Sequence, residues 1–293
     1  MKPLLVPVDF SKPAENAARY AIQLSKAVKS DVCLCHAFLV PAEATGSEQI
    51  VWPLYELSAL ESTADEHLKH LAKKLELEAQ PIHNTPSAFH PAISCSAIPG
   101  DTTDMLNQLV NDKKAGLVVM GLSGASAVSK FFIGSVSRRT IEHVKCPVLL
   151  VPGNVRFREI KKIAFATDLS AGDVQVVHSL SAFAAHVDAD LVVTHIIAEF
   201  DDAEKSKNKS KAFLRHLTNE IDYDRIYYRE VMHAEVDDGL NWLAKNGKID
   251  VLAMVHHHKS LLSRMFGSSH TKTLAEHINL PLMVFPSSKQ FTL

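Results

Sequence analysis

One segment reads Leu117-Val118-Val119-Met120-Gly121-Leu122-Ser123-Gly124 and is followed, nine residues later, by Gly134-Ser135-Val136. Its apolar first half predicts a buried strand, and the residues from Val136 to Ile141 predict a helix. A glycine loop between a strand and a helix is typical of phosphate binding. Glycines let backbone N–H groups approach an anion, and the helix N-terminus supplies free donors. The segment is therefore a candidate phosphate-binding loop.

Length and composition narrow the class of protein. The 293 residues predict about two domains. A content of 46% apolar and 22% charged residues is typical of a soluble globular protein, and no stretch reaches the ~18 apolar residues of a membrane span. The net charge of -2 argues against a nucleic-acid partner. The four cysteines are scattered and no signal peptide is recognisable, so we expect a cytoplasmic protein without a membrane partner.

The first part of the chain is repeated in its second part. An apolar strand that ends in Asp-x-Ser occurs at Asp9 and again at Asp168, a step of 159 residues. A second apolar strand ends at His36 and again at His195, which is the same step. Strand, helix and strand therefore keep one register in both halves.

Later strands repeat with a shorter step. Met120 and Met254 end matching apolar runs that are 134 residues apart, and Pro152 and Pro286 are separated by the same distance. The first half must then carry about 25 additional residues, which we place near residues 41–65. A repeat this long indicates two copies of one domain in tandem rather than a solenoid. We expect the domains to cover residues 1–153 and 154–293.

Each half alternates strands and helices. In the first half, strands are expected at Leu4–Asp9, Val32–Phe38, Ala92–Ala97, Leu117–Met120 and Val148–Val151. Helices are expected near Pro13–Val28, Glu66–Glu78, Asp104–Asp112 and Ser135–Val144, the first of them capped by Ser11. Strands that are apolar on both faces and alternate with helices predict a parallel sheet covered on both sides, which is a doubly wound α/β domain. Such sheets bind ligands at the carboxyl ends of their strands.

With these residues the chain resembles the universal stress proteins. Nucleotide-binding members carry Gly-x2-Gly-x9-Gly-Ser after the fourth strand and an aspartate at the end of the first. Gly121, Gly124, Gly134, Ser135 and Asp9 meet this pattern. The resemblance implies two tandem Rossmann-like domains, each with five parallel strands in the order 3-2-1-4-5. It also implies that the domains pack as the subunits of a dimer do, with their last strands near a pseudo-twofold axis, and further homodimers are compatible with it.

The resemblance further implies an adenine nucleotide as ligand, ATP or else ADP or AMP, with Mg²⁺ as a companion ion. The implied contacts are with the base and ribose at the end of the first two strands, with the nucleoside at the end of the fourth, and with the phosphates at the glycine loop. In that order they are Pro7, Val8, Asp9 and Ala37; Met120 and Gly121; and Gly124, Gly134, Ser135 and Val136. The protein would act as a stress sensor or regulator. Hydrolysis of ATP would at most be slow, because no general base is evident near the loop.

The second half departs from the pattern. Val255, His258 and Ser268 stand where the first half has glycines, so we expect the second half to bind nucleotide poorly or not at all. A different function stays open: a scaffold, or a ligand- or metal-binding stress protein, that acts through the second domain and the segment 41–65 around Trp52.

Two groups of polar residues near the loops have alternative explanations. The run His256, His257 and His258 could contribute to a metal site only with ligands from elsewhere, since zinc needs three or four converging ligands. A polar loop is the simpler interpretation. Lys130, Arg138 and Arg139 could neutralise phosphate, although a solvated helix face explains them equally well. Enzymes of related nucleotide-binding folds need a His-x-Gly-His or a Ser-Gly-Gly-x-Asp-Ser loop, and neither motif occurs.

Overall fold

The structure, a computed structural model, describes residues 2–39, 54–79, 89–122, 134–199, 203–256 and 280–286. In the first half its strands are β1 (Leu4–Pro7), β2 (Val32–Phe38), β3 (Ile93–Pro99), β4 (Leu117–Leu122) and β5 (Val148–Pro152). Its helices there are α1 (Lys12–Val28), α2 (Leu54–Ala79), α3 (Thr102–Lys113) and α4 (Ser135–His143). Strands and helices alternate as the sequence predicts.

The second half repeats this succession. Its strands are β6 (Lys162–Thr167), β7 (Asp190–Ala198), β8 (Ile226–His233), β9 (Val251–His256) and β10 (Leu282–Pro286). The helices described between them are α5 (Asp173–Val187), α6 (Ala203–Glu220) and α7 (Val236–Asn246).

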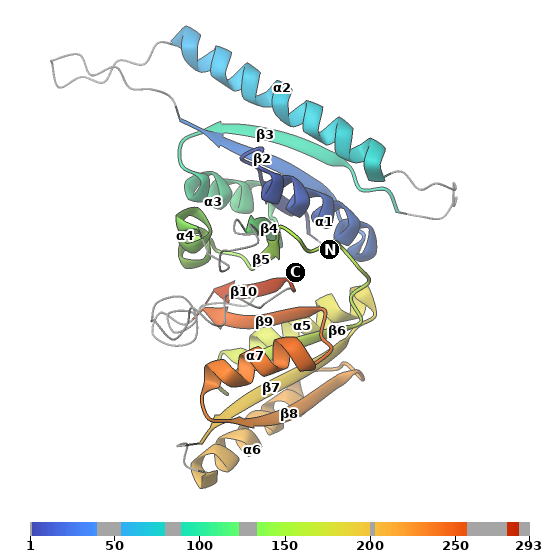
Figure 1. The fold of residues 1–293 in the computed structure, drawn as a ribbon, viewed down its shortest axis with the longest axis vertical. Coiled ribbons are helices and arrows are strands. Elements are labelled where there is room, and N and C mark those ends of the chain that lie inside the picture. The colour runs from blue at the N-terminus through green and yellow to red at the C-terminus, as the bar shows by residue number, and fades with distance from the viewer. Residues whose placement is uncertain are drawn as a thin grey trace, which may run out of the picture.

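All the described strands belong to one sheet, which runs the length of the molecule (Figure 1). Its order is β3-β2-β1-β4-β5-β10-β9-β6-β7-β8. Each half therefore has five parallel strands in the order 3-2-1-4-5, which confirms the expected doubly wound fold. The halves join where β5 and β10 pair antiparallel, with Leu149 opposite Met283. The last strands of the two halves thus meet at the centre, as expected for a pseudo-dimer.

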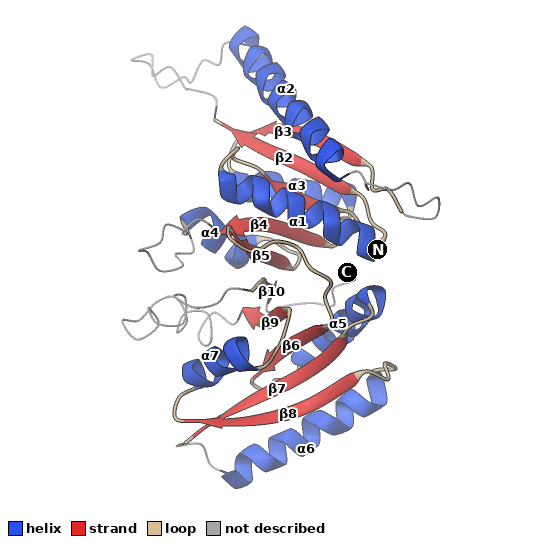
Figure 2. Ribbon diagram, turned by 45° about the vertical axis from the view of Figure 1, so that its right-hand side comes forward, coloured by secondary structure: helices blue, strands red, loops and turns tan. Residues whose placement is uncertain are grey.

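Helices cover both faces of this sheet (Figure 2). Buried side chains of α1, α2, α5 and α6 form one continuous apolar cluster with one face of the strands. Those of α3, α4 and α7 form a second cluster on the opposite face. Because both faces are buried, the strands are apolar throughout rather than alternating, and the sequence pattern has this cause.

Helix α1 begins at the turn that follows β1. Ser11 is its N-cap, and the Ser11 side chain accepts a hydrogen bond from the backbone N–H of Ala14. Phe10, just before the cap, has a φ of 60°, and Leu169 at the repeated position has a φ of 63°. Both halves therefore enter their first helix through the same left-handed residue.

Helix α2 is longer than predicted. The sequence placed its start at Glu66, whereas the structure extends it back to Leu54, so that the part of the additional segment from residue 54 onward is helical. The rest of that segment, including Trp52, lies outside the described residues. Arg19 of α1 donates to Glu78 of α2 at 2.6 Å, and Lys74 of α2 donates to Glu15 at 3.0 Å, so ion pairs tie the two helices together.

The cysteines are free and mostly buried. Cys33, Cys35 and Cys146 lie inside the protein, and Cys95 is half-buried. Burial raises the pKa of Cys146 to about 12, so its thiol stays protonated at neutral pH. A packing role, as the sequence indicates, accounts for these residues.

Asn16 connects α1 to the segment that links the two halves. Its side-chain amide is buried and donates to the carbonyl oxygens of Pro152 at 3.2 Å and Val155 at 2.8 Å. Its carbonyl oxygen accepts from Arg156 at 3.1 Å. The side chain thereby satisfies backbone groups where the chain leaves β5, which a buried linker requires.

We expect Asn16→Leu to lower the free energy of unfolding by about 2 kcal/mol, because two carbonyl oxygens lose their donor. Urea denaturation followed by circular dichroism measures the change. Gln175 occupies the repeated position on α5 and is exposed, so Gln175→Leu is the matched control with little expected effect. Equal losses for the two variants would contradict the assignment.

Candidate functional site

A cavity of about 220 Å³ lies at the carboxyl ends of β1 and β4. β1 pairs with β2 on one side and β4 on the other, so the strand order reverses at this point of the sheet. Doubly wound sheets bind their ligands at such a reversal, since the connecting helices leave the sheet on opposite faces there and open a crevice.

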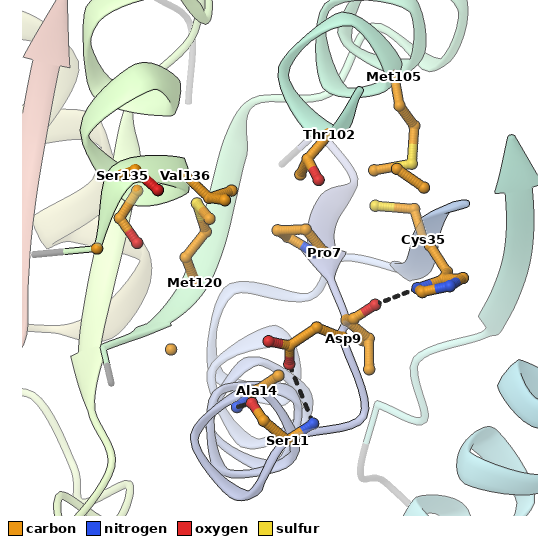
Figure 3. A pocket seen from close by; sticks show the side chains of 16 residues that line it. Pro7, Asp9, Ser11, Ala14, Cys35, Thr102, Met105, Met120, Ser135 and Val136 are labelled. Carbon is orange, nitrogen blue, oxygen red and sulfur yellow. Dashed lines mark hydrogen bonds between the residues drawn. The ribbon is translucent and has the colours of Figure 1, made fainter. Parts of the chain in front are cut away.

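The cavity brings together the predicted site residues that the structure describes. These are Pro7, Val8, Asp9, Ala37, Met120, Gly121, Gly134, Ser135 and Val136. Figure 3 shows Met120, Ser135 and Val136 on one side of the cavity, Met105 and Cys35 on the other, and Pro7 between them. Gly124 lies outside the described residues.

Sequence reasoning missed further lining residues, which are Ser11, Ala14, Cys35, His36, Thr102, Met105 and Ser137. Cys35 could have been found, because it lies two residues before Ala37 on the same face of β2. Thr102 and Met105 could not, because the position of the α3 N-terminus over the crevice depends on the crossover from β3 and leaves no local pattern.

Asp9 forms the turn between β1 and α1 on the cavity wall. Its carboxylate accepts a hydrogen bond from the backbone N–H of Ser11 at 3.0 Å, and its side chain is exposed to solvent. The strand itself ends two residues earlier than predicted, at Pro7. Asp9 therefore lies on the turn, where a carboxylate can reach a ligand while one of its oxygens holds the loop.

His36 is fixed at the end of β2. Its Nδ1 lies 2.6 Å from the carbonyl oxygen of Val8, so Nδ1 carries a proton and donates to that oxygen. The His36 ring lies 4.8 Å from that of Phe10, and Phe10 lies 5.7 Å from His67 of α2. These ring contacts brace the left-handed Phe10 beside the cavity.

Gly121 is required by packing. A Cβ atom at this position would lie 2.3 Å from the carbonyl oxygen of Pro13 and 2.9 Å from the backbone nitrogen of Ala14. The glycine thus permits the first turn of α1 to cross β4 at close range. The sequence interpretation assigned Gly121 to the nucleoside alone, and the packing role could not be read from the motif.

Gly134 differs from Gly121 in this respect. Its φ of −59° suits any residue, and a Cβ atom there would meet nothing within 4 Å. It is the N-cap of α4 but supplies no side-chain hydrogen bond. The next residues, Ser135, Val136 and Ser137, line the cavity, and N–H groups in the first turn of a helix have no intrahelical partner. This open helix start fits an anionic group such as a phosphate.

The basic residues near α4 divide into three groups. Arg139 donates to Asp101 at 3.0 Å and is therefore engaged in an ion pair. The backbone N–H of Thr103 and the Arg139 guanidinium together lower the pKa of Asp101, which caps α3. Arg138 is exposed, and Lys130 lies outside the described residues. The α4 backbone is thus the better candidate for binding phosphate.

Only one residue of the histidine run is described. His256 is the last residue of β9 and is half-buried, whereas His257 and His258 lie outside the described residues. Among the described residues, no three His, Cys, Asp or Glu side chains lie close enough to hold a metal ion. None of the described helices is long and apolar enough to span a membrane.

Comparison with known proteins agrees with the repeat. The sequence profile of the universal stress protein family matches residues 1–152 and again residues 159–286. The chain is 27% identical over 154 residues to universal stress protein MJ0531 of Methanocaldococcus jannaschii, which covers 51% of the chain and 81% of that protein. It is 28% identical over 150 residues to a universal stress protein of Thermus aquaticus, which covers 51% of the chain and 98% of that protein.

A solved structure shares the tandem architecture. The crystal structure of a universal stress protein from Archaeoglobus fulgidus superposes with a TM-score of 0.69 at 15% identity and covers 98% of both chains. A putative universal stress protein from Pseudomonas aeruginosa superposes with a TM-score of 0.56 at 13% identity and covers 98% of this chain and 93% of its own. The chain therefore belongs to the universal stress protein family and carries two of its domains in tandem.

Proposed function

We propose that the first half of this chain binds an adenine nucleotide, with ATP as the leading candidate and ADP or AMP as alternatives, in the cavity between β1 and β4. The protein would use this binding to sense or regulate a cytoplasmic stress response. Mg²⁺ would enter with the triphosphate oxygens rather than through a dedicated protein site.

The observation that carries this proposal is the composition of the cavity wall. Pro7 and Ala37 offer apolar surface of the kind that suits a base, and the exposed Asp9 carboxylate can accept hydrogen bonds from ribose hydroxyls. The start of α4, at Gly134 and Ser135, offers free backbone N–H groups and the positive end of a helix dipole. A ligand with an apolar ring, a polyol and an anionic tail matches this succession.

We also propose that the chain divides into functional units at residues 1–153 and 154–293. The family matches, which end at residue 152 and resume at residue 159, support this division. So does the position of the 152–156 linker, which Asn16 holds against α1. In this division the nucleotide site lies entirely in the first unit.

Isothermal titration of the purified, nucleotide-stripped protein with Mg·ATP tests the proposal. We expect one equivalent per chain, because the second half lacks the open glycines. Mass spectrometry of the small molecules that copurify, together with parallel titrations of ADP and AMP, identifies the preferred nucleotide. Absence of binding by any of the three nucleotides would refute the function, and two equivalents of similar affinity would refute the asymmetry.

A further inference from the structure

The two crevices of this chain can be compared residue by residue, because the strand registers repeat. Leu4 pairs with Val32 in the first half, and the residues 159 positions later, Ile163 and Leu191, pair in the second. Likewise β4 and β9 differ by 134 positions in their pairing with β1 and β6. Each residue that lines the first cavity therefore has a defined counterpart.

At the base end, the second half carries a larger side chain on its strand. Ile196 stands in place of Ala37, is only 6% exposed and packs in the cluster that contains β9 and α7. Gly239 stands in place of Met105: the backbone N–H of each bonds to the carbonyl oxygen of its helix N-cap. A Cβ atom at Gly239 would lie 2.5 Å from Cγ2 of Ile196. The glycine is thus needed because Ile196 occupies the space beside the helix.

At the helix end, the second half carries a buried carboxylate. Asp173 stands in place of Ala14 and is only 2% exposed. It accepts hydrogen bonds from the hydroxyls of Thr167 at 2.5 Å and Ser170 at 2.8 Å, where Thr167 replaces Val8. These short bonds hold a negative charge at the mouth of the crevice, and such a charge disfavours an anionic ligand.

Val255, which stands in place of Gly121, contributes in a different way. A Cβ atom at Gly121 points at the first turn of α1, so the side chain of Val255 is directed at the start of α5. Accordingly α5 begins at Asp173, two positions later than α1 does in the repeat register. This replacement shortens the helix rather than filling the crevice.

From these replacements we infer that the second crevice is closed to nucleosides by its own side chains, with Ile196 filling the base end and Asp173 the helix end. The inference rests on the proposed function, because it treats the first cavity as the nucleotide site. It also separates two causes: the changed glycine loop affects phosphate binding only, whereas Ile196 and Asp173 exclude the uncharged nucleoside as well.

Equilibrium dialysis with radiolabelled adenosine distinguishes the possibilities, since adenosine has no phosphate and does not need the glycine loop. The parent protein is expected to bind one equivalent, and the double variant Ile196→Ala with Asp173→Ala is expected to bind two. One equivalent for both proteins would overturn the inference and leave the proposed function intact. No binding by the parent together with one equivalent for the variant would do the reverse.

A graft in the first half keeps the inference testable if the double variant does not fold. Ala37→Ile with Met105→Gly transfers the second-half pair into the first cavity, and we expect it to weaken adenosine binding about 100-fold. Ile196→Ala alone is the matched control and should leave the affinity of the first half unchanged. Parental affinity in the grafted, folded protein would show that this pair does not close a crevice.

Discussion

Replacing Gly121 with valine is expected to destabilise the protein by at least about 3 kcal/mol, because the new side chain must displace backbone rather than another side chain. Its Cβ would lie 2.3 Å from the Pro13 carbonyl oxygen and 2.5 Å from the carbonyl carbon. Neither atom can rotate away, so α1 would have to lift from β4 or lose its first turn. The loss is about a third of the stability of a typical domain.

Thermal and urea unfolding of Gly121→Val, followed by circular dichroism, measure this effect. Gly134→Val is the matched control: it makes the same substitution on the same cavity wall, but a Cβ at Gly134 has open space around it. The second half shows how the chain adapts to valine at this position, since Val255 coincides with a later helix start at Asp173. A Gly121→Val protein as stable as the parent would show that α1 is not held by this contact.

Much of the fold could be predicted because the repeat supplies two independent copies of each signal. Identical steps of 159 and 134 residues placed matching strands in order, and the apolar strands indicated a sheet covered on both faces. The strand pairing then follows, since right-handed crossovers leave few alternatives. The predicted site residues meet in one cavity for the same reason: they all lie at the carboxyl ends of neighbouring parallel strands.

Other features depend on contacts between distant segments and leave no local pattern. The start of α2 at Leu54 was missed because the helix continues through a segment without a second copy for comparison. The partners of Asn16 lie across the linker between the halves, some 136 and 139 residues away in sequence. Gly121 was read as a ligand contact because the motif does not reveal that α1 lies against it.

Gly134→Val is expected to reduce the affinity for ATP by about 100-fold while changing stability little. The valine side chain would stand beside the free N–H groups of Ser135 and Val136 and keep a phosphate from reaching them. The backbone tolerates the change, since its φ is −59° and no atom lies within 4 Å of the added Cβ. Valine is a poorer N-cap than glycine, and this costs about 1 kcal/mol of helix stability.

Titration calorimetry with Mg·ATP and adenosine separates this effect from a general loss of structure. The variant should lose affinity for ATP and keep its affinity for adenosine, because only the phosphates contact the start of α4. Gly172→Val is the matched control: Gly172 is also an N-cap glycine without a side-chain cap bond and with open space around it, but it precedes α5 of the second half. It carries the same helix penalty and should bind ATP like the parent. If both variants bind ATP equally well, the helix start at Gly134 does not hold the phosphates.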